Sequence, residues 1–220
     1  MSGPANGEHV ILLHGLGRTD RSMAKMAERL TEQGYAVTNL DYPSRKAPIE
    51  QLSDEFLHAA VQTALKGSPA RVHFVTHSLG GIVVRYYLGR HEVANLGRVV
   101  MLAPPNQGSE VADRLHDTFY YRWSTGPAGQ QLTTGPESFA DRLGPVAFDC
   151  GVIAGSSRVN PFFAWWVPGP SDGTVPVERA RVEGMKDFLI VPCSHTFIMR
   201  DKEVIRQTEY FLRTGRFDKA

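Results

Sequence analysis

Ser78 is the residue whose surroundings most clearly suggest chemistry. It stands in the sequence THSLGG, between an apolar run at residues 71–76 and a helical pattern at residues 80–88. A sharp turn between a strand and a helix lifts a serine hydroxyl above a sheet edge, and the residues two positions away must be small because strand and helix nearly touch. The two glycines supply that small size on one side, and the N-terminus of the helix favours developing negative charge. The pattern predicts a nucleophilic serine; the alternative is an ordinary serine turn before a helix.

This motif resembles the G-H-S-x-G-G elbow of bacterial lipases and esterases in the α/β-hydrolase family. The sequence departs from the pattern at Thr76, where the family usually carries glycine, so the packing must accommodate a β-branched side chain there. The resemblance implies an α/β fold of three layers, with a mostly parallel sheet between helices. It also implies a serine mechanism in which the acid and then the histidine follow the nucleophile along the chain.

A general base must remove the proton of a serine hydroxyl, and a third group must orient that base. The histidines that follow Ser78 are His91, His116 and His195. His91 follows the end of a predicted helix, and His116 lies in a long insertion. His195 follows the last predicted strand, where the family places its histidine, so the resemblance assigns His195 as the base.

The candidate acid is Asp172, in the sequence PSDGTVP, which matches the family's D-G-x-V-P turn. Asp149 lies within a predicted strand, and Asp187 precedes the last strand at the wrong edge of the sheet. A plain Asp-Gly turn is the alternative interpretation of Asp172. By the resemblance, Asp172 orients His195.

Ester cleavage passes through an oxyanion that backbone N–H groups stabilise, and removing one such donor costs about 3–4 kcal/mol. The sequence HGLG at residues 14–17 resembles the H-G-x-G oxyanion loop of lipases. The resemblance assigns the two donors to the amides of Leu16 and Leu79. We expect His14 to brace this loop. A further segment at residues 102–109 is similar to the G-T-P-x-x-G-S segment of bacterial lipases.

The elements that must position these groups alternate between strands and helices. Helical periodicity predicts helices before Gly34, over residues 49–65 and 80–88, and over about 202–212. Parallel strands need crossover connections, so the alternation predicts a mostly parallel sheet with helices on both faces. The predicted strands are residues 9–13, 35–40, 71–76, 98–103, 148–154 and 188–192.

Two long stretches interrupt this alternation, at residues 104–147 and 156–171. Both follow the carboxyl end of a strand, where ligands bind in open parallel sheets, and long irregular insertions are usually lids or binding loops. We therefore expect one domain, residues 1–220, with a cap or lid insertion at about 105–147. The aromatic residues of these stretches either bind substrate, in an acyl pocket or an interfacial rim, or form a local hydrophobic core. The substrate-binding candidates are Tyr120, Phe162, Trp165 and Trp166.

The composition fits one globular domain, because 42% of the 220 residues are hydrophobic and 21% are charged. The formal net charge of +1 gives no electrostatic reason to expect a nucleic-acid partner. No apolar run approaches the roughly 20 residues that cross a bilayer, and no signal peptide is evident, so we expect a cytoplasmic protein. Cys150 and Cys193 are expected to be free thiols, with no metal site or disulfide.

Taken together, these residues predict a serine hydrolase that cleaves carboxylic esters with an apolar acyl group. The expected partner is a small-molecule ester or lipid, and the mechanism needs no metal or organic cofactor. The same residues serve a thioesterase, an amidase or an acyltransferase. An alternative outside enzymes is a hydrolase fold retained as a non-catalytic binding module.

Overall fold

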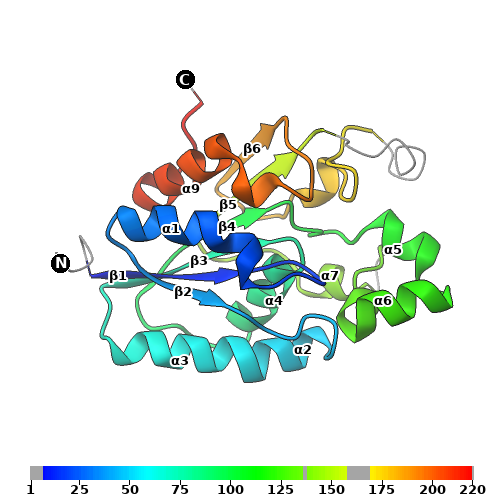
Figure 1. Ribbon diagram of the computed structural model, residues 1–220, viewed down its shortest axis with the longest axis horizontal. Coiled ribbons are helices and arrows are strands. Elements are labelled where there is room, and N and C mark those ends of the chain that lie inside the picture. The colour runs from blue at the N-terminus through cyan, green and yellow to red at the C-terminus, as the bar shows by residue number, and fades with distance from the viewer. Residues whose placement is uncertain (1–6, 136–137, 158–168, 220) are drawn as a thin grey trace.

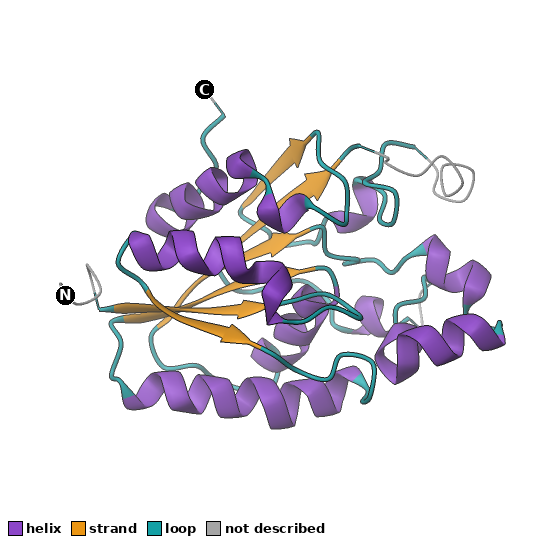
Figure 2. Cartoon of the chain, viewed as in Figure 1, coloured by secondary structure: helices purple, strands orange, loops and turns teal. Residues whose placement is uncertain are grey.

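The computed structural model describes residues 7–135, 138–157 and 169–219, and its centre is one parallel sheet of six strands (Figures 1 and 2). The strand order is β2-β1-β3-β4-β5-β6. The α/β class and the parallel sheet predicted from the sequence are confirmed, and the predicted strand ends are shifted by at most two residues. The strands are β1 (Glu8–Leu13), β2 (Ala36–Leu40), β3 (Arg71–His77), β4 (Leu96–Leu102), β5 (Cys150–Gly155) and β6 (Asp187–Val191).

Helices cover both faces of the sheet, because alternate side chains of each strand point to opposite faces. In β1, Val10 and Leu12 pack with α1 (Ala24–Glu32) and α9 (Lys202–Thr214), whereas Ile11 and Leu13 pack with the helices of the other face. Figure 1 shows α1 and α9 above the sheet and α3 below it. The second face is covered by α2 (Ile49–Gln51), α3 (His58–Lys66) and α4 (Leu79–Leu88). The predicted three-layer arrangement is therefore confirmed.

Two of the predicted helices differ in detail from the structure. The helix expected over residues 49–65 is interrupted by a π-helical stretch, η2 (Leu52–Leu57), between α2 and α3. The last helix, α9, begins at a cap in which Asp201 accepts hydrogen bonds from the amides of Glu203 and Val204. It runs to Thr214, two residues beyond the predicted end, and stops at Gly215, whose φ of 79° suits glycine.

The stretch after β4, expected to be irregular, contains three helices, so that expectation was wrong. The helices are α5 (Glu110–Leu115), α6 (Phe119–Gln130) and α7 (Phe139–Arg142). Side-chain caps start two of them: Thr118 accepts a hydrogen bond from the amide of Tyr121, and Ser138 accepts one from Asp141. Gly126 and Pro127 kink α6, and these two residue types had hidden the helical pattern in the sequence.

Short 3-10 helices complete the described chain: η1 (Asp20–Met23), η3 (Glu178–Ala180) and η4 (Ile198–Arg200). Among the described residues, no helix combines the length and the apolar character needed to cross a membrane.

The strand register aligns the carboxyl ends of β1, β3 and β4. Leu13 of β1 lies opposite Thr76 of β3, and Thr76 lies opposite Met101 of β4. Because the strands are parallel, the loops that follow them all leave from the same edge of the sheet.

Candidate active site

Ser78 occupies a tight turn between β3 and α4, with backbone angles φ 50° and ψ −119°. A non-glycine residue with positive φ costs about 1–3 kcal/mol and persists only where its surroundings enforce it. Here the Ser78 amide donates to the Leu102 carbonyl at 2.9 Å, and the Ser78 carbonyl accepts from the Gly81 amide at 2.9 Å. The turn thereby holds the serine side chain at the carboxyl edge of the sheet.

The two glycines after Ser78 allow α4 to approach the strand ends closely. A Cβ on Gly80 would lie 2.9 Å from the carbonyl oxygen of Leu13, which no side chain tolerates without a backbone shift. A Cβ on Gly81 would lie 3.3 Å from the Oγ1 of Thr76. The absence of a side chain at Gly81 therefore makes room for the β-branched Thr76, which is fully buried.

The side chains of Ser78, His195 and Asp172 form a continuous chain of hydrogen bonds. His195 Nδ1 lies 2.7 Å from Asp172 Oδ2, and His195 Nε2 lies 3.1 Å from Ser78 Oγ. An Nδ1–H donated to the Asp172 carboxylate leaves the Nε2 lone pair to accept the serine hydroxyl proton. This is the geometry that general-base activation of a serine requires.

Asp172 is fixed by its own turn before it touches the histidine. Its Oδ1 accepts hydrogen bonds from the amides of Thr174 and Val175 at 2.9 and 2.8 Å, and only 3% of the residue is exposed. Its backbone carbonyl also accepts the His195 amide at 3.0 Å. A Cβ on Gly155, at the end of β5, would lie 2.8 Å from the Cβ of Asp172. Gly155 thus makes space for the acid, a role that the sequence did not reveal.

The other histidines and aspartates considered in the sequence lie away from this cluster. His91 stacks on Tyr87, and His116 bonds to the carbonyl of Asp113. Asp149 pairs with Lys186, and Asp187 accepts the amide of Phe217. The three residues that come together are the ones that follow β3, β5 and β6, because the carboxyl ends of parallel strands share one edge.

The loop after β1 is braced by His14, whose side chain is fully buried. Its ring stacks on Tyr42 with centroids 4.2 Å apart, and the Tyr42 hydroxyl donates to the His14 carbonyl at 2.6 Å. Burial lowers the pKa of His14 and raises that of Tyr42, so the histidine stays neutral and the phenol keeps its proton. The Gly17 amide donates to Ser44 Oγ at 3.0 Å. The bracing expected of His14 is what the structure shows.

The candidate oxyanion donors lie on either side of Ser78. A Cβ on Gly15 would lie 3.2 Å from the Cβ of Ser78, so the loop after β1 passes directly beside Ser78. Neither the Leu16 amide nor the Leu79 amide donates a hydrogen bond to another described residue. Both amides are thus available to a ligand oxygen.

His77 connects the parts of the site and was not singled out by the sequence. Its Nε2 lies 3.0 Å from the His195 carbonyl, and the two rings are 4.9 Å apart. Burial holds the His77 pKa well below its usual value, and the neighbouring His195 lowers it further. His77 is therefore neutral and donates its Nε2–H to the loop that carries His195. Only its place beside Ser78 could have suggested this role.

Ser78 and His195 open into a cavity of about 290 Å³, the active-site cavity. Its apolar described lining residues are Leu16, Pro105, Val111, Tyr121, Leu132 and Val175. Tyr120 is 75% exposed and is not among the described lining residues. Successive residues of an α-helix point about 100° apart, so Tyr121 of α6 faces the cavity in place of Tyr120. Phe162, Trp165 and Trp166 lie outside the described residues.

Neither a metal site nor a reactive cysteine is evident in the described part of the chain. No group of three or more His, Cys, Asp or Glu side chains there is arranged to hold a metal ion. Cys150, at the start of β5, and Cys193, after β6, are free thiols. Burial raises the pKa of both to about 12, so both remain protonated at neutral pH.

Comparison with known proteins places this geometry in a family. A solved structure of the Bacillus licheniformis lipase BlEst2 in mature form matches with a TM-score of 0.75 and 18% identity, over 96% of this chain and 94% of that chain. The metagenomic carboxyl esterase MGS0156 matches with a TM-score of 0.71 and 19% identity, over 90% of this chain and 67% of that chain. At these identities the likeness establishes the fold.

Sequence comparison gives a relative that matches about half of this chain, and a family model. The Lysosomal thioesterase PPT2 of Homo sapiens is 30% identical over 124 residues, which cover 54% of this chain and 39% of that protein. This chain therefore matches well under half the length of that relative. The model of the Alpha/beta hydrolase family matches residues 10–213. Because this match spans nearly the whole chain, the protein belongs to the alpha/beta hydrolase family.

Proposed function

We propose that this protein is a serine hydrolase that cleaves carboxylic esters through an acyl-enzyme intermediate. The observation that carries the proposal is the hydrogen-bonded chain from Ser78 through His195 to Asp172. The strained elbow, the buried acid and the two unengaged amides beside the serine support it. A binding module would have no need to maintain this combination.

In the first half of the reaction, Ser78 Oγ attacks the ester carbonyl carbon while His195 Nε2 takes the hydroxyl proton. The carbonyl oxygen becomes an oxyanion, which the amides of Leu16 and Leu79 stabilise. The Asp172 carboxylate stabilises the imidazolium through Nδ1–H. The C–O bond to the leaving group then breaks, and His195 returns the proton to the departing alkoxide, which leaves as an alcohol.

In the second half, a water molecule attacks the acyl carbon of the ester formed with Ser78. His195 removes one proton from this water, and a second oxyanion forms against the same two amides. When the bond to Ser78 Oγ breaks, His195 gives the proton back to the serine. The products are a carboxylic acid and the regenerated enzyme.

We also propose that the insertion at about residues 105–147 acts as a cap over the acyl group. Val111 of α5 and Tyr121 of α6 contribute to the wall of the active-site cavity, together with Leu132. A mostly apolar wall suits the acyl half of an ester, since burying apolar surface yields about 25 cal/mol per Å².

A thioester is the second candidate substrate, and the similarity to Lysosomal thioesterase PPT2 favours it. The same three side chains serve this reaction, with a thiolate as the leaving group. Matched oxygen and sulfur esters of one acyl group separate the two candidates. A higher kcat/KM for the sulfur ester, after correction for the uncatalysed rates, would assign the thioester.

The test of the proposed function uses p-nitrophenyl esters of graded acyl length. We expect hydrolysis that Ser78→Ala reduces by at least about 10⁴-fold, because the nucleophile and the base act as a unit. A fluorophosphonate probe should label the wild type and leave Ser78→Ala unlabelled. Circular dichroism checks that the variant is folded. Full activity in folded Ser78→Ala would overturn the mechanism.

A further inference from the structure

A second cavity adjoins the active-site cavity and carries more positive than negative charge. We call it the basic cavity; its volume is about 510 Å³. Arg18 lines both cavities and is the only Lys, Arg, Asp or Glu among the described residues of the active-site cavity. The basic cavity is lined by Gly17, Arg18, Thr19, Asp41, Tyr42, Pro43, Ser44, Arg45, Lys46 and Phe56.

The cations of the basic cavity outnumber its carboxylates. Arg18, Arg45 and Lys46 face a single acid, Asp41, whose Oδ1 lies 3.3 Å from the Nε2 of the neutral His14. Within the described parts of the chain, none of the three cations forms an ion pair. Their charge is therefore available to an anionic ligand.

The basic cavity is joined to the candidate oxyanion loop by direct contacts. Ser44 Oγ accepts the Gly17 amide at 3.0 Å. A Cβ on Gly17 would lie 3.5 Å from Arg45 Cδ and 4.0 Å from Arg45 Nε, so the arginine side chain lies against this loop. Arg18 itself is the second residue after Leu16 in the chain. Arg18 thus borders the active-site cavity, and Arg45 lies against the loop that carries one candidate oxyanion donor.

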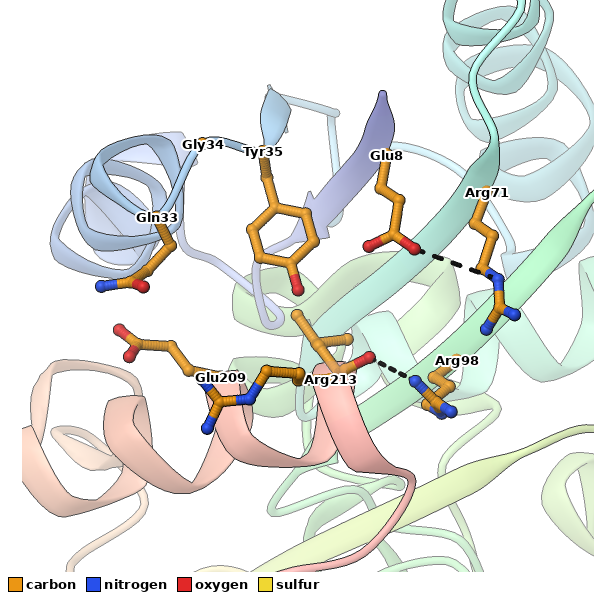
Figure 3. Close-up of a pocket in the computed structure, with 9 residues that line it drawn as sticks. Glu8, Gln33, Gly34, Tyr35, Arg71, Arg98, Glu209 and Arg213 are labelled. Carbon is orange, nitrogen blue, oxygen red and sulfur yellow. Dashed lines mark hydrogen bonds and ion pairs between the residues drawn. The ribbon is translucent and has the colours of Figure 1, made fainter. Parts of the chain in front are cut away.

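A pocket at the opposite edge of the sheet allows a comparison of how arginines are paired (Figure 3). There Arg71 Nε lies 3.9 Å from a Glu8 carboxylate oxygen, and Arg98 donates to the Leu212 carbonyl at 2.6 Å. Glu209 also lines that pocket and accepts from Arg29 at 2.8 Å. A carboxylate and a carbonyl of the chain thus engage Arg71 and Arg98, whereas no cation of the basic cavity has a carboxylate partner among the described residues. Arg213, the third arginine of this pocket, lies over the Tyr210 ring at 5.7 Å.

We propose that Arg18, Arg45 and Lys46 bind an anionic group, a phosphate or a carboxylate, on the alcohol or thiol half of the substrate. This inference rests on the proposed function. The acyl half occupies the mostly apolar active-site cavity, because a charged group would lose too much hydration there. The alcohol or thiol half, which leaves first, can place its anionic group in the basic cavity, because the three cations there are solvent-exposed. Guanidinium groups pair with either anion through two parallel hydrogen bonds.

The test compares two chromogenic esters that differ only in charge: 4-nitro-3-(butanoyloxy)benzoate and the matching neutral benzamide. We expect the wild type to cleave the benzoate with the higher kcat/KM, mainly through a lower KM. Each of the variants Arg18→Gln, Arg45→Gln and Lys46→Gln should lower kcat/KM for the benzoate by about three- to tenfold, which is the effect of one exposed charged hydrogen bond. Cleavage of the benzamide should change little. Added salt should reduce the preference by screening.

Arg213→Gln, in the pocket of Figure 3, is the matched control and should leave both rates unchanged. A third ester carries a phosphate in place of the carboxylate. If both charged esters are cleaved with a higher kcat/KM than the benzamide, the faster of the two identifies the preferred anion. Equal rates on the benzoate and the benzamide would overturn the anion site while leaving the proposed function intact. Inactivity on all three esters would count against the proposed function itself.

Discussion

Strand β3 carries a buried histidine near each end, and the two histidines differ in what they touch. His73, toward the amino end, accepts the Arg98 amide at Nδ1 with a distance of 2.9 Å and lies 3.6 Å from a Glu8 oxygen. His77, at the carboxyl end, donates to the His195 carbonyl and lies beside Ser78. Burial lowers the pKa of both. The same residue type on one strand therefore serves packing at one edge and the candidate active site at the other.

The two edges of the sheet differ in the same way beyond these histidines. The carboxyl edge holds the positive φ of Ser78, a nearly buried carboxylate at Asp172 and two amides without described acceptors. The amino edge holds paired charges, such as Arg71 with Glu8. Both edges hold non-glycine residues with positive φ, namely Ser68 and Asn95 at the amino edge and Ser78 and Ala103 at the carboxyl edge. The nearly buried carboxylate and the two unengaged amides therefore distinguish the carboxyl edge, and backbone strain alone does not.

The largest expected effect comes from Asp172→Asn at the carboxyl edge. The amide retains the size of the carboxylate but favours the wrong tautomer of His195 and no longer stabilises the imidazolium. We expect kcat on p-nitrophenyl butanoate to fall by about 10⁴-fold. Arg71→Gln at the amino edge should leave kcat unchanged. A folded Asp172→Asn variant with near wild-type kcat would contradict the role given to this acid.

The second effect concerns stability and belongs to the amino edge. Burial lowers the pKa of His73 from 6.5 to about 4 in the folded chain. The unfolded chain therefore binds more protons between these values, and the free energy of unfolding should fall as pH drops from about 6.5 toward 4. The full loss from this group is about 3 kcal/mol, from 1.36 kcal/mol per pKa unit.

His73→Asn tests this linkage, since its Oδ1 can accept the Arg98 amide and the side chain does not titrate. Urea unfolding at pH 7 and pH 5 gives the comparison. We expect the variant to lose less stability than the wild type between the two pH values, while His77 still contributes its share. If the free energy of unfolding depended on pH identically in both proteins, His73 would not be the source of the pH dependence.

The sheet, Ser78 and Asp172 could be predicted because each depends on local patterns. Apolar runs mark the strands, and the sequences THSLGG and PSDGTVP place a serine and an aspartate in tight turns. The resemblance to the family assigned His195 from its position after the last strand, and in the structure the shared edge of the parallel sheet brings the three side chains together.

What the sequence could not supply depends on contacts between distant segments. Gly155 makes room for Asp172, and Arg45 lies against Gly17, across intervals that no local pattern reports. The helix α6 was missed because Gly126 and Pro127 resemble a loop signal, although they form a kink in the structure. Choosing Tyr121 in place of Tyr120 would have required the rotational phase of that unpredicted helix.

The smallest expected effect separates the two histidines of β3 directly. His77→Leu removes the donor to the His195 carbonyl, and a small displacement of the base should lower kcat by about tenfold. His77→Gln carries an Nε2–H at a similar reach and should recover most of that loss. His73→Leu removes the acceptor for the Arg98 amide, so it should lower the free energy of unfolding by about 1–3 kcal/mol and leave kcat unchanged. All rates are measured well below the midpoint of thermal unfolding, so that stability does not enter them. Equal losses of kcat in the two leucine variants would show that His73 affects catalysis as much as His77 does, and the distinction between the two histidines would fail.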